Sequence, residues 1–218
     1  MNKSMLALLD SSLYPQVWEQ QTFSDAHSVL IAMLTGNIAP DAKAFSKQLL
    51  TNDVYQQWIH FTVFGGYLQR NFIAFYRQTE DSFNTDMPAL FHRELIRHAQ
   101  YLPLAQTLFL AGEMPKSARS DKLLTMTVNP ATAVINMQQA HKKSVINHSE
   151  AVINQITVVG SQVVGFPIRH NKRTSERTRN EVLILDFQEL RLVNEENISS
   201  KKRSNIDETI LLRSYELR

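Results

Sequence analysis

The chain contains no cysteine and only six glycines in 218 residues. Without cysteine, it can form no disulfide, no catalytic thiolate and no zinc site with thiolate ligands. A chain without cysteine is compatible with both oxidising and reducing compartments. The glycine patterns of the P-loop and of the dinucleotide-binding fingerprint are also missing. Phosphate sites built on glycine loops are therefore not expected.

The chain also lacks an excess of charge of one sign and any long hydrophobic run. Its 23 lysines and arginines and 21 acidic residues leave a formal net charge of +2, so nucleic acid is not required as a partner. No apolar run approaches the roughly 18 residues that span a bilayer, and the N-terminus lacks the order of a signal peptide. We expect a soluble, cytoplasmic protein without a membrane span; delivery into a target cell would use a route without a cleaved signal.

The seven histidines do not form a metal-binding pattern. No HExxH pair occurs, and His92 and His98, six residues apart, would not share one face of a helix. No metal site is therefore expected. A Ser-His-Asp triad stays open, although the Gly-x-Ser-x-Gly elbow is absent.

Apolar residues make up 43% of the chain, enough for a substantial core. Up to about residue 101, apolar residues three and four positions apart predict helices, with Ser24, Gly36 and Asn52 as end signals. The predicted helices are Asp25–Thr35, Asp41–Leu50, two helices within Val54–Arg77 broken at Gly65-Gly66, and Pro88–Tyr101. The many aromatic side chains of Val54–Arg77 are expected in the core.

After Pro103 the pattern changes to short apolar runs between polar loops, which predicts strands. These are Thr107–Ala111, Leu123–Thr127, Val152–Val159, Val163–Phe166, Glu181–Leu185, Arg191–Val193 and Thr209–Leu217, with one helix from Pro130 to His141 capped by Asn129. Helices followed by strands are typical of the α+β class. We expect one domain over residues 1–218, with a helical half (1–101) packed on a β-rich half (102–218).

Three short motifs follow one another in the β-rich half. The first is a strand that stops at Gly112. The second carries hydroxyls at Thr125 and Thr127, which point the same way because they are two residues apart on a strand, and it enters the helix through Asn129. The third is Glu181, which begins an apolar strand after a polar loop. Each motif alone has a plain alternative: ordinary strand residues, a helix cap, and a surface glutamate.

The order of these motifs resembles the bacterial and phage mono-ADP-ribosyltransferases of the Arg/Ser-Thr-Ser/Glu type, over roughly residues 54–218. Thr125-Met126-Thr127 is similar to the Ser-Thr-Ser element, and Arg179-Asn180-Glu181-Val182-Leu183 to the Glu/Gln-x-Glu-Val-Leu element. Further similar segments are Gly66–Phe72, Pro103–Phe109, Ile210–Leu212 and Tyr215–Leu217. The resemblance implies an ADP-ribosyltransferase-like core of mixed and antiparallel strands.

The resemblance also implies NAD as a substrate and transfer of ADP-ribose to a protein acceptor by a toxin or effector. Cleavage of the nicotinamide bond builds positive charge on the ribose, and a carboxylate at the ribose hydroxyl, here Glu181, would stabilise that charge. Thr125 and Thr127 would orient the carboxylate and line the nicotinamide pocket. The implied cofactor-binding residues are Arg70, Asn71, Gly112, Asn129 and Phe166, and the implied acceptor loop contains Arg173, Arg177 and Arg179.

The sequence departs from the family pattern at two positions. The first strand ends in Leu110-Ala111, where the family has an arginine that binds the phosphates of NAD through charged hydrogen bonds. Either another cation binds the phosphates of NAD in place of this arginine, or NAD is bound weakly, or the site is inactive. Candidates for that cation are Arg70, Lys116 and Arg119. Arg179 stands where many members have the Glu or Gln that selects the acceptor.

Two other functions stay open. The missing arginine is compatible with a binding protein on the same fold that has lost catalysis. A nucleic-acid-binding protein would show an affinity that falls steeply with salt and would use Arg169, Lys172, Arg173, Arg177, Arg179 and Lys201–Arg203. This second alternative is disfavoured because Glu176 and Glu181 interrupt the first basic cluster and Asp207 and Glu208 follow the second.

Overall fold

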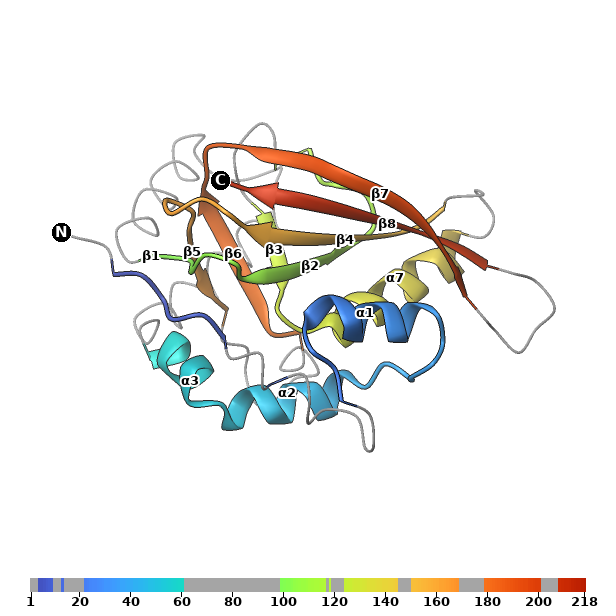
Figure 1. Ribbon diagram of the computed structural model, residues 1–218, viewed down its shortest axis with the longest axis horizontal. Helices are drawn as coiled ribbons and strands as arrows, with labels where there is room; N and C mark the ends of the chain where they lie inside the picture. The colour runs from blue at the N-terminus through green and yellow to red at the C-terminus, as the bar shows by residue number, and fades with distance from the viewer. Residues whose placement is uncertain are drawn as a thin grey trace, which may run out of the picture.

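The computed structural model describes residues 4–9, 13, 22–60, 99–116, 118, 124–144, 150–168, 179–200 and 208–218. These residues form four helices and one eight-stranded sheet (Figure 1). The helices are α1 (Ala26–Leu34), α2 (Ala42–Thr51), α3 (Asp53–His60) and α7 (Pro130–Ser144). The strands are β1 (Gln100–Tyr101), β2 (Thr107–Ala111), β3 (Leu124–Thr127), β4 (Ala151–Val158), β5 (Val164–Pro167), β6 (Glu181–Asp186), β7 (Leu190–Ser200) and β8 (Glu208–Leu217).

The strands lie in the order β1-β5-β6-β3-β2-β4-β8-β7. Neighbouring strands are antiparallel except β4 and β8, which run parallel. The sheet is therefore mixed, and the expected α+β organisation is confirmed at this level. Strands β2, β3 and β6, which carry the three motifs, are neighbours near the middle of the sheet.

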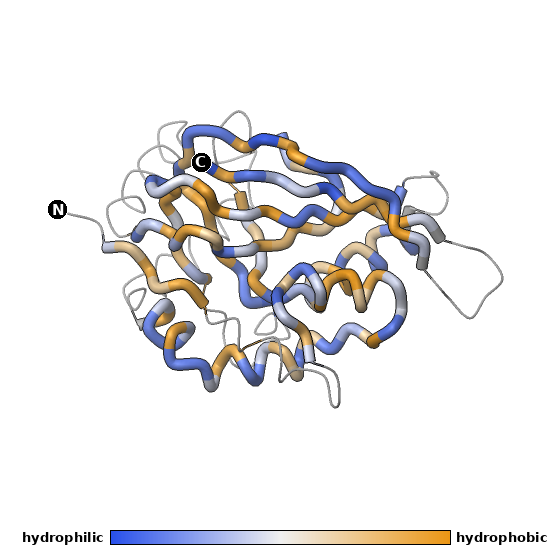
Figure 2. The backbone as a smooth tube through the Cα atoms, in the orientation of Figure 1, coloured by the Kyte–Doolittle hydropathy of each residue, from blue (hydrophilic) through white to orange (hydrophobic). Residues whose placement is uncertain are grey.

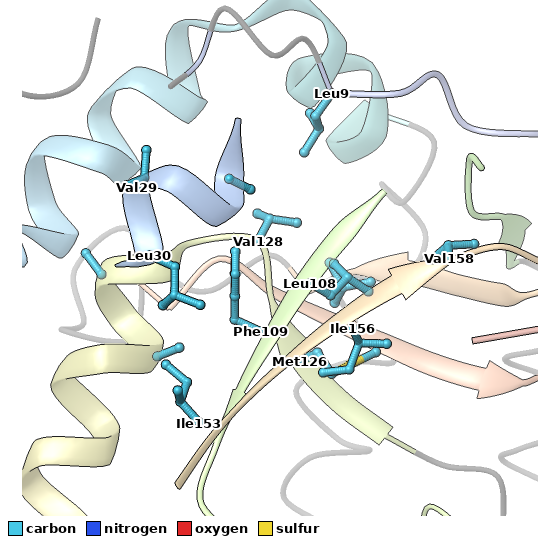
Figure 3. Packing of buried hydrophobic residues seen from close by; sticks show 14 of the residues in the cluster. Leu9, Val29, Leu30, Leu108, Phe109, Met126, Val128, Ile153, Ile156 and Val158 are labelled. Atoms are coloured by element: carbon cyan, nitrogen blue, oxygen red, sulfur yellow. The ribbon is translucent and has the colours of Figure 1, made fainter. Parts of the chain in front are cut away.

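Apolar side chains are buried on both faces of the sheet. Neighbouring residues of a strand point to opposite faces, and Leu108 and Phe109 of β2 are both fully buried. Figure 3 shows Phe109 on the side of β2 where Leu30 of α1 lies, and Leu108 on the other side. Helix α7 contacts β2, β3 and β4. Figure 2 shows that α1 is largely hydrophobic and that the edge strand β7 is largely hydrophilic.

One hydrophobic cluster connects the helices with the sheet. It includes buried residues of α1, α2, α3 and α7 and of strands β2, β3, β4, β6 and β8. In the described parts of both halves, the apolar side chains therefore pack into the same core. No helix among the described residues is long and apolar enough to cross a membrane.

The helix ends follow local capping chemistry. Asp25, not the expected Ser24, caps α1, because its carboxylate accepts the amide of Ser28 at 2.8 Å while Ser24 donates to that same carboxylate. Asp41 caps α2 in the same way, so α2 begins one residue later than predicted. Gly36 has φ 78°, as expected for a glycine that ends a helix.

Most predicted strands are confirmed. Strand β2 has the predicted bounds, and β3, β6 and β8 differ from the prediction by one residue at one end. Strands β4 and β5 are each shifted by one residue at both ends, and α7 begins at Pro130 as predicted. The predicted helix Pro88–Tyr101 is wrong at its end, because Gln100 and Tyr101 pair with β5 as strand β1. Strand β7 is also much longer than the predicted Arg191–Val193. The predicted helices beyond His60 lie outside the described residues, as does most of Pro88–Tyr101.

Candidate functional site

The strand register brings the motif residues to one face of the sheet. Glu181, the first residue of β6, is paired with Thr127 of β3, and Thr127 is paired with Phe109 of β2. Thr125 is paired with Leu183 in the next row. Residues paired in this way share a face, so Glu181, Thr125 and Thr127 lie on the face that α1 covers at Phe109.

Glu181 combines a fixed backbone with an accessible carboxylate. Its carbonyl accepts the amide of Ile168 at 2.7 Å. The side chain is 18% exposed, and Nη1 of Arg179 lies 3.7 Å from its Oε1. This separation is that of an ion pair and exceeds a direct hydrogen bond. Because the Arg179 side chain is itself 37% exposed, the pair lies at the surface and contributes little to stability.

The hydroxyl of Thr127 bonds to main-chain groups and not to the carboxylate of Glu181. Its single hydroxyl proton is shared between the carbonyls of Arg179 and Asn180, and its oxygen accepts the amide of Asn129 at 2.9 Å. A hydroxyl has one proton to donate, so Thr127 does not orient Glu181 by a side-chain hydrogen bond. It fixes the two residues that precede Glu181. Thr125, on the same face, is exposed.

Asn180 lies at the centre of a buried polar cluster. It has φ 46°, a left-handed conformation that Asn tolerates better than most residues. Its Nδ2 donates to the hydroxyl oxygens of Ser46 and Tyr55 at 3.3 and 3.4 Å, and its Oδ1 accepts from Nδ2 of Asn129 at 3.0 Å. The cluster therefore joins α2, α3, the start of α7 and the start of β6.

Asn129 caps α7, as predicted: its Oδ1 accepts the amide of Thr132 at 3.2 Å. Its Nδ2 also donates to the carbonyl of Ala42 at 3.1 Å, and the residue is fully buried. Asn129 thus holds the elements of the site together and offers no surface to NAD. Phe166 of β5, paired with Leu183, is also buried, and the expected contact of these two residues with NAD does not match this burial.

Strand β2 ends at a glycine for a conformational reason. Gly112 has φ 83°, and an added Cβ would meet nothing within 4 Å, so the left-handed backbone favours glycine here. Its amide donates to the carbonyl of Val152 at 2.8 Å, and its carbonyl accepts from Asn154 at 2.6 Å. The predicted stop of the first motif strand at Gly112 is confirmed.

An arginine does lie near the end of β2, but on the other face. Arg213 of β8 donates to Glu113 at 2.5 Å and to Glu195 at 2.8 Å. The register of β2, β4 and β8 places Arg213 on the face of Leu110, whereas Glu181 lies on the opposite face. Arg213 therefore cannot replace the arginine missing from the first motif.

Comparison of the chain with protein-family models, with curated proteins and with solved structures finds no match. The interpretation of the site thus depends on its own residues and geometry.

Several predicted site residues lie outside the described residues, namely Arg70, Asn71, Arg119, Arg173 and Arg177. Lys116 is exposed in the turn after β2. Among the described residues, no group of three or more histidine or acidic side chains is placed to hold a metal ion. The ring of His27 bonds to Oε1 of Gln155 at 2.8 Å.

Sequence reasoning missed the role of three residues in the buried cluster: Ser46, Tyr55 and Asn180. Tyr55 was expected only as part of the aromatic core, and Ser46 is one polar residue on a helix face that buries Phe45 and Leu49. A signal was present only at Asn180, since Asn before a strand is a common left-handed residue.

Proposed function

We propose that the protein is an NAD-dependent mono-ADP-ribosyltransferase that modifies a protein acceptor, as a toxin or effector would. One observation carries the proposal: the three motifs, far apart in the sequence, lie on neighbouring strands β2, β3 and β6, and Glu181 is paired with Thr127. This arrangement supports a site in which the carboxylate of Glu181 and the exposed hydroxyl of Thr125, on neighbouring strands and on the same face of the sheet, meet one ligand.

The proposed reaction uses Glu181 to stabilise a developing charge. The bond from the ribose anomeric carbon to nicotinamide breaks, and its electron pair leaves with the neutral nicotinamide. The Glu181 carboxylate accepts a hydrogen bond from a ribose hydroxyl and stabilises the cationic sugar. A lone pair of the acceptor then forms the new bond to the anomeric carbon, and the acceptor loses a proton.

Thr125 and Arg179 complete the proposed site on either side of Glu181. The exposed hydroxyl of Thr125 lies on the same face of the sheet, two residues before Thr127, and is proposed to line the nicotinamide pocket. Arg179, whose guanidinium lies beside the carboxylate, is proposed to meet the acceptor together with Arg173 and Arg177.

The first test is release of nicotinamide from NAD by wild-type protein and by Glu181→Gln. The wild type should release nicotinamide, and the variant should lose at least about 100-fold in rate, the scale of one essential electrostatic group. Its unfolding temperature should stay within about 2 °C, because surface substitutions of a partly exposed side chain cost little. The matched control is Glu150→Gln, an exposed glutamate just before β4, which should keep its activity. Full activity in Glu181→Gln would refute the proposal.

One observation favours a second function, in which the protein has the same fold and binds its ligand but does not catalyse a reaction. Ala111 stands at the position of the family's arginine, and Arg213 lies on the wrong face to substitute for it. Isothermal titration with NAD distinguishes the two proposals. Saturable NAD binding without nicotinamide release supports the binding protein, and binding with turnover excludes it.

A further inference from the structure

We infer that Asn180 is a positioning residue. Its side chain bonds to α2 and α3 and in this way fixes the start of β6, where Glu181 lies. The inference rests on the proposed function of Glu181, because Asn180 is expected to act on the reaction only through that carboxylate.

The backbone of Asn180 is held by β3. Its carbonyl accepts the hydroxyl of Thr127 and the amide of Val128, both at 3.2 Å. The carbonyl of Arg179 also accepts from Thr127. Together with φ 46° at Asn180, these bonds set the orientation of the peptide group that leads into Glu181.

The side chain of Asn180 ties this backbone to helices that are distant in the sequence. Ser46 of α2 and Tyr55 of α3, which accept its two Nδ2 bonds, are 134 and 125 residues away along the chain. Burial raises the pKa of the Tyr55 phenol, so this acceptor stays neutral at working pH. Asn129 donates to Oδ1 and adds the start of α7.

Such a tether matters for the rate because catalysis depends on the exact placement of the reacting group. A displacement of about 1 Å can cost about 100-fold in rate. The main chain of Glu181 is bonded to Ile168, and its carboxylate lies at the surface beside Arg179. The cluster around Asn180 is therefore the rigid support from which the carboxylate extends.

The test is Asn180→Gly. Glycine adopts a positive φ without strain, so this variant keeps the backbone conformation and removes the side-chain tether. For nicotinamide release, kcat should fall about 10- to 100-fold, whereas KM for NAD should change less than about threefold. The control is Gln106→Ala, which removes another buried amide, one that bonds to the amide of Leu9 and to the carbonyl of Thr107. It should lower the unfolding temperature to a similar extent and keep the wild-type kcat.

A second variant covers the case in which Asn180→Gly does not fold. Tyr55→Phe keeps the buried ring and removes one acceptor, and kcat should fall about 3- to 10-fold. In the Asn180→Gly background, Tyr55→Phe should have no further effect on kcat, because the two residues act as one unit.

The outcomes separate this inference from the proposed function. If wild-type protein does not release nicotinamide, both are overturned. If the wild type is active and Asn180→Gly keeps its kcat, or loses no more than Gln106→Ala, only the positioning role is overturned. If only Tyr55→Phe folds, a wild-type kcat in that variant overturns the positioning role.

Discussion

Thr125 and Thr127 share a strand and a face but have different surroundings. Thr127 is buried and exchanges hydrogen bonds with the main chain of three residues, whereas Thr125 is exposed. The hydroxyl of Thr127 is therefore structural, and that of Thr125 is the one a ligand can reach.

Valine substitutions should separate these two roles. Thr127→Val removes the side-chain acceptor of the buried Asn129 amide and the hydroxyl that donates to the carbonyls of Arg179 and Asn180. It should lower the free energy of unfolding by about 1–3 kcal/mol. Thr125→Val should change it by less than about 0.5 kcal/mol and should reduce nicotinamide release. Urea unfolding measures the first effect. Equal losses of stability in the two variants would contradict the assignment.

The sequence predicts only part of the site. Alternating hydroxyls, a glycine stop and a glutamate at a strand start are local patterns, so Gly112, Thr127 and Glu181 lie at the expected strand positions. The bonds of the Thr127 hydroxyl to the main chain were not expected. The partners of Asn180 on α2 and α3 follow no local pattern, since such contacts depend on how the helices pack on the sheet. The burial of Asn129 has the same origin. Its role as a helix cap can be predicted from the sequence, but its burial depends on packing against other elements, such as α2 at Ala42.

At the scale of elements, α1 depends on its cap. The helix has nine residues, too few to be stable alone, and it contacts α7 and β7. The hydrogen bond from the amide of Ser28 is the main cause of the lowered pKa of Asp25. The hydroxyls of Ser24 and Ser28 lower this pKa further, whereas desolvation of the carboxylate raises it. An ionised Asp25 thus favours the folded protein.

The Asp25→Asn variant should reveal this linkage. Because the pKa of Asp25 is lowered in the folded protein, its stabilisation is present near neutral pH and is lost as the pH falls below about 4. Asparagine also caps helices well, so at pH 6 the variant should be less stable by about 0.3–1 kcal/mol, the scale of one exposed charge at a helix N-terminus. Urea unfolding at pH 6 and pH 3 measures the difference, and a gap that does not narrow between these two pH values would contradict the assignment.

Strands show where local patterns succeed and fail. Strands β2, β4 and β6 are apolar and were predicted closely, because burial makes their composition distinctive. Strand β7 is an edge strand of mostly exposed residues, so only its first few residues carry an apolar signal. The two-residue strand β1 exists through its pairing with β5, and no sequence pattern of two residues predicts such a pairing.

At the scale of the whole molecule, the helices and the sheet share one core. Trp58 of α3 is fully buried, and its indole donates to the carbonyl of Ala7 at 2.8 Å. The same hydrophobic cluster includes Ile153 of β4 and Leu212 of β8. Loosening of α3 should therefore be coupled to loosening of the sheet.

This coupling predicts a single cooperative unfolding transition. In a Trp18→Phe variant, Trp58 is the only tryptophan of the chain and reports on α3, while far-UV circular dichroism reports on the entire chain. The two urea curves should coincide, as expected for a two-state domain. Separate midpoints would show that the helical and β-rich halves unfold independently.

The parallel pairing of β4 with β8 has a consequence for the folding pathway. Strands β7 and β8 are consecutive and antiparallel, so they can form a hairpin early, soon after the hydrophobic collapse of the chain. Joining Ala151 to Ile210 must instead close a long loop that contains β5, β6 and β7, which is slow. Docking of this hairpin along β4 is therefore the expected rate-limiting step. Until it occurs, β4 presents an open edge to which a strand of another chain can pair.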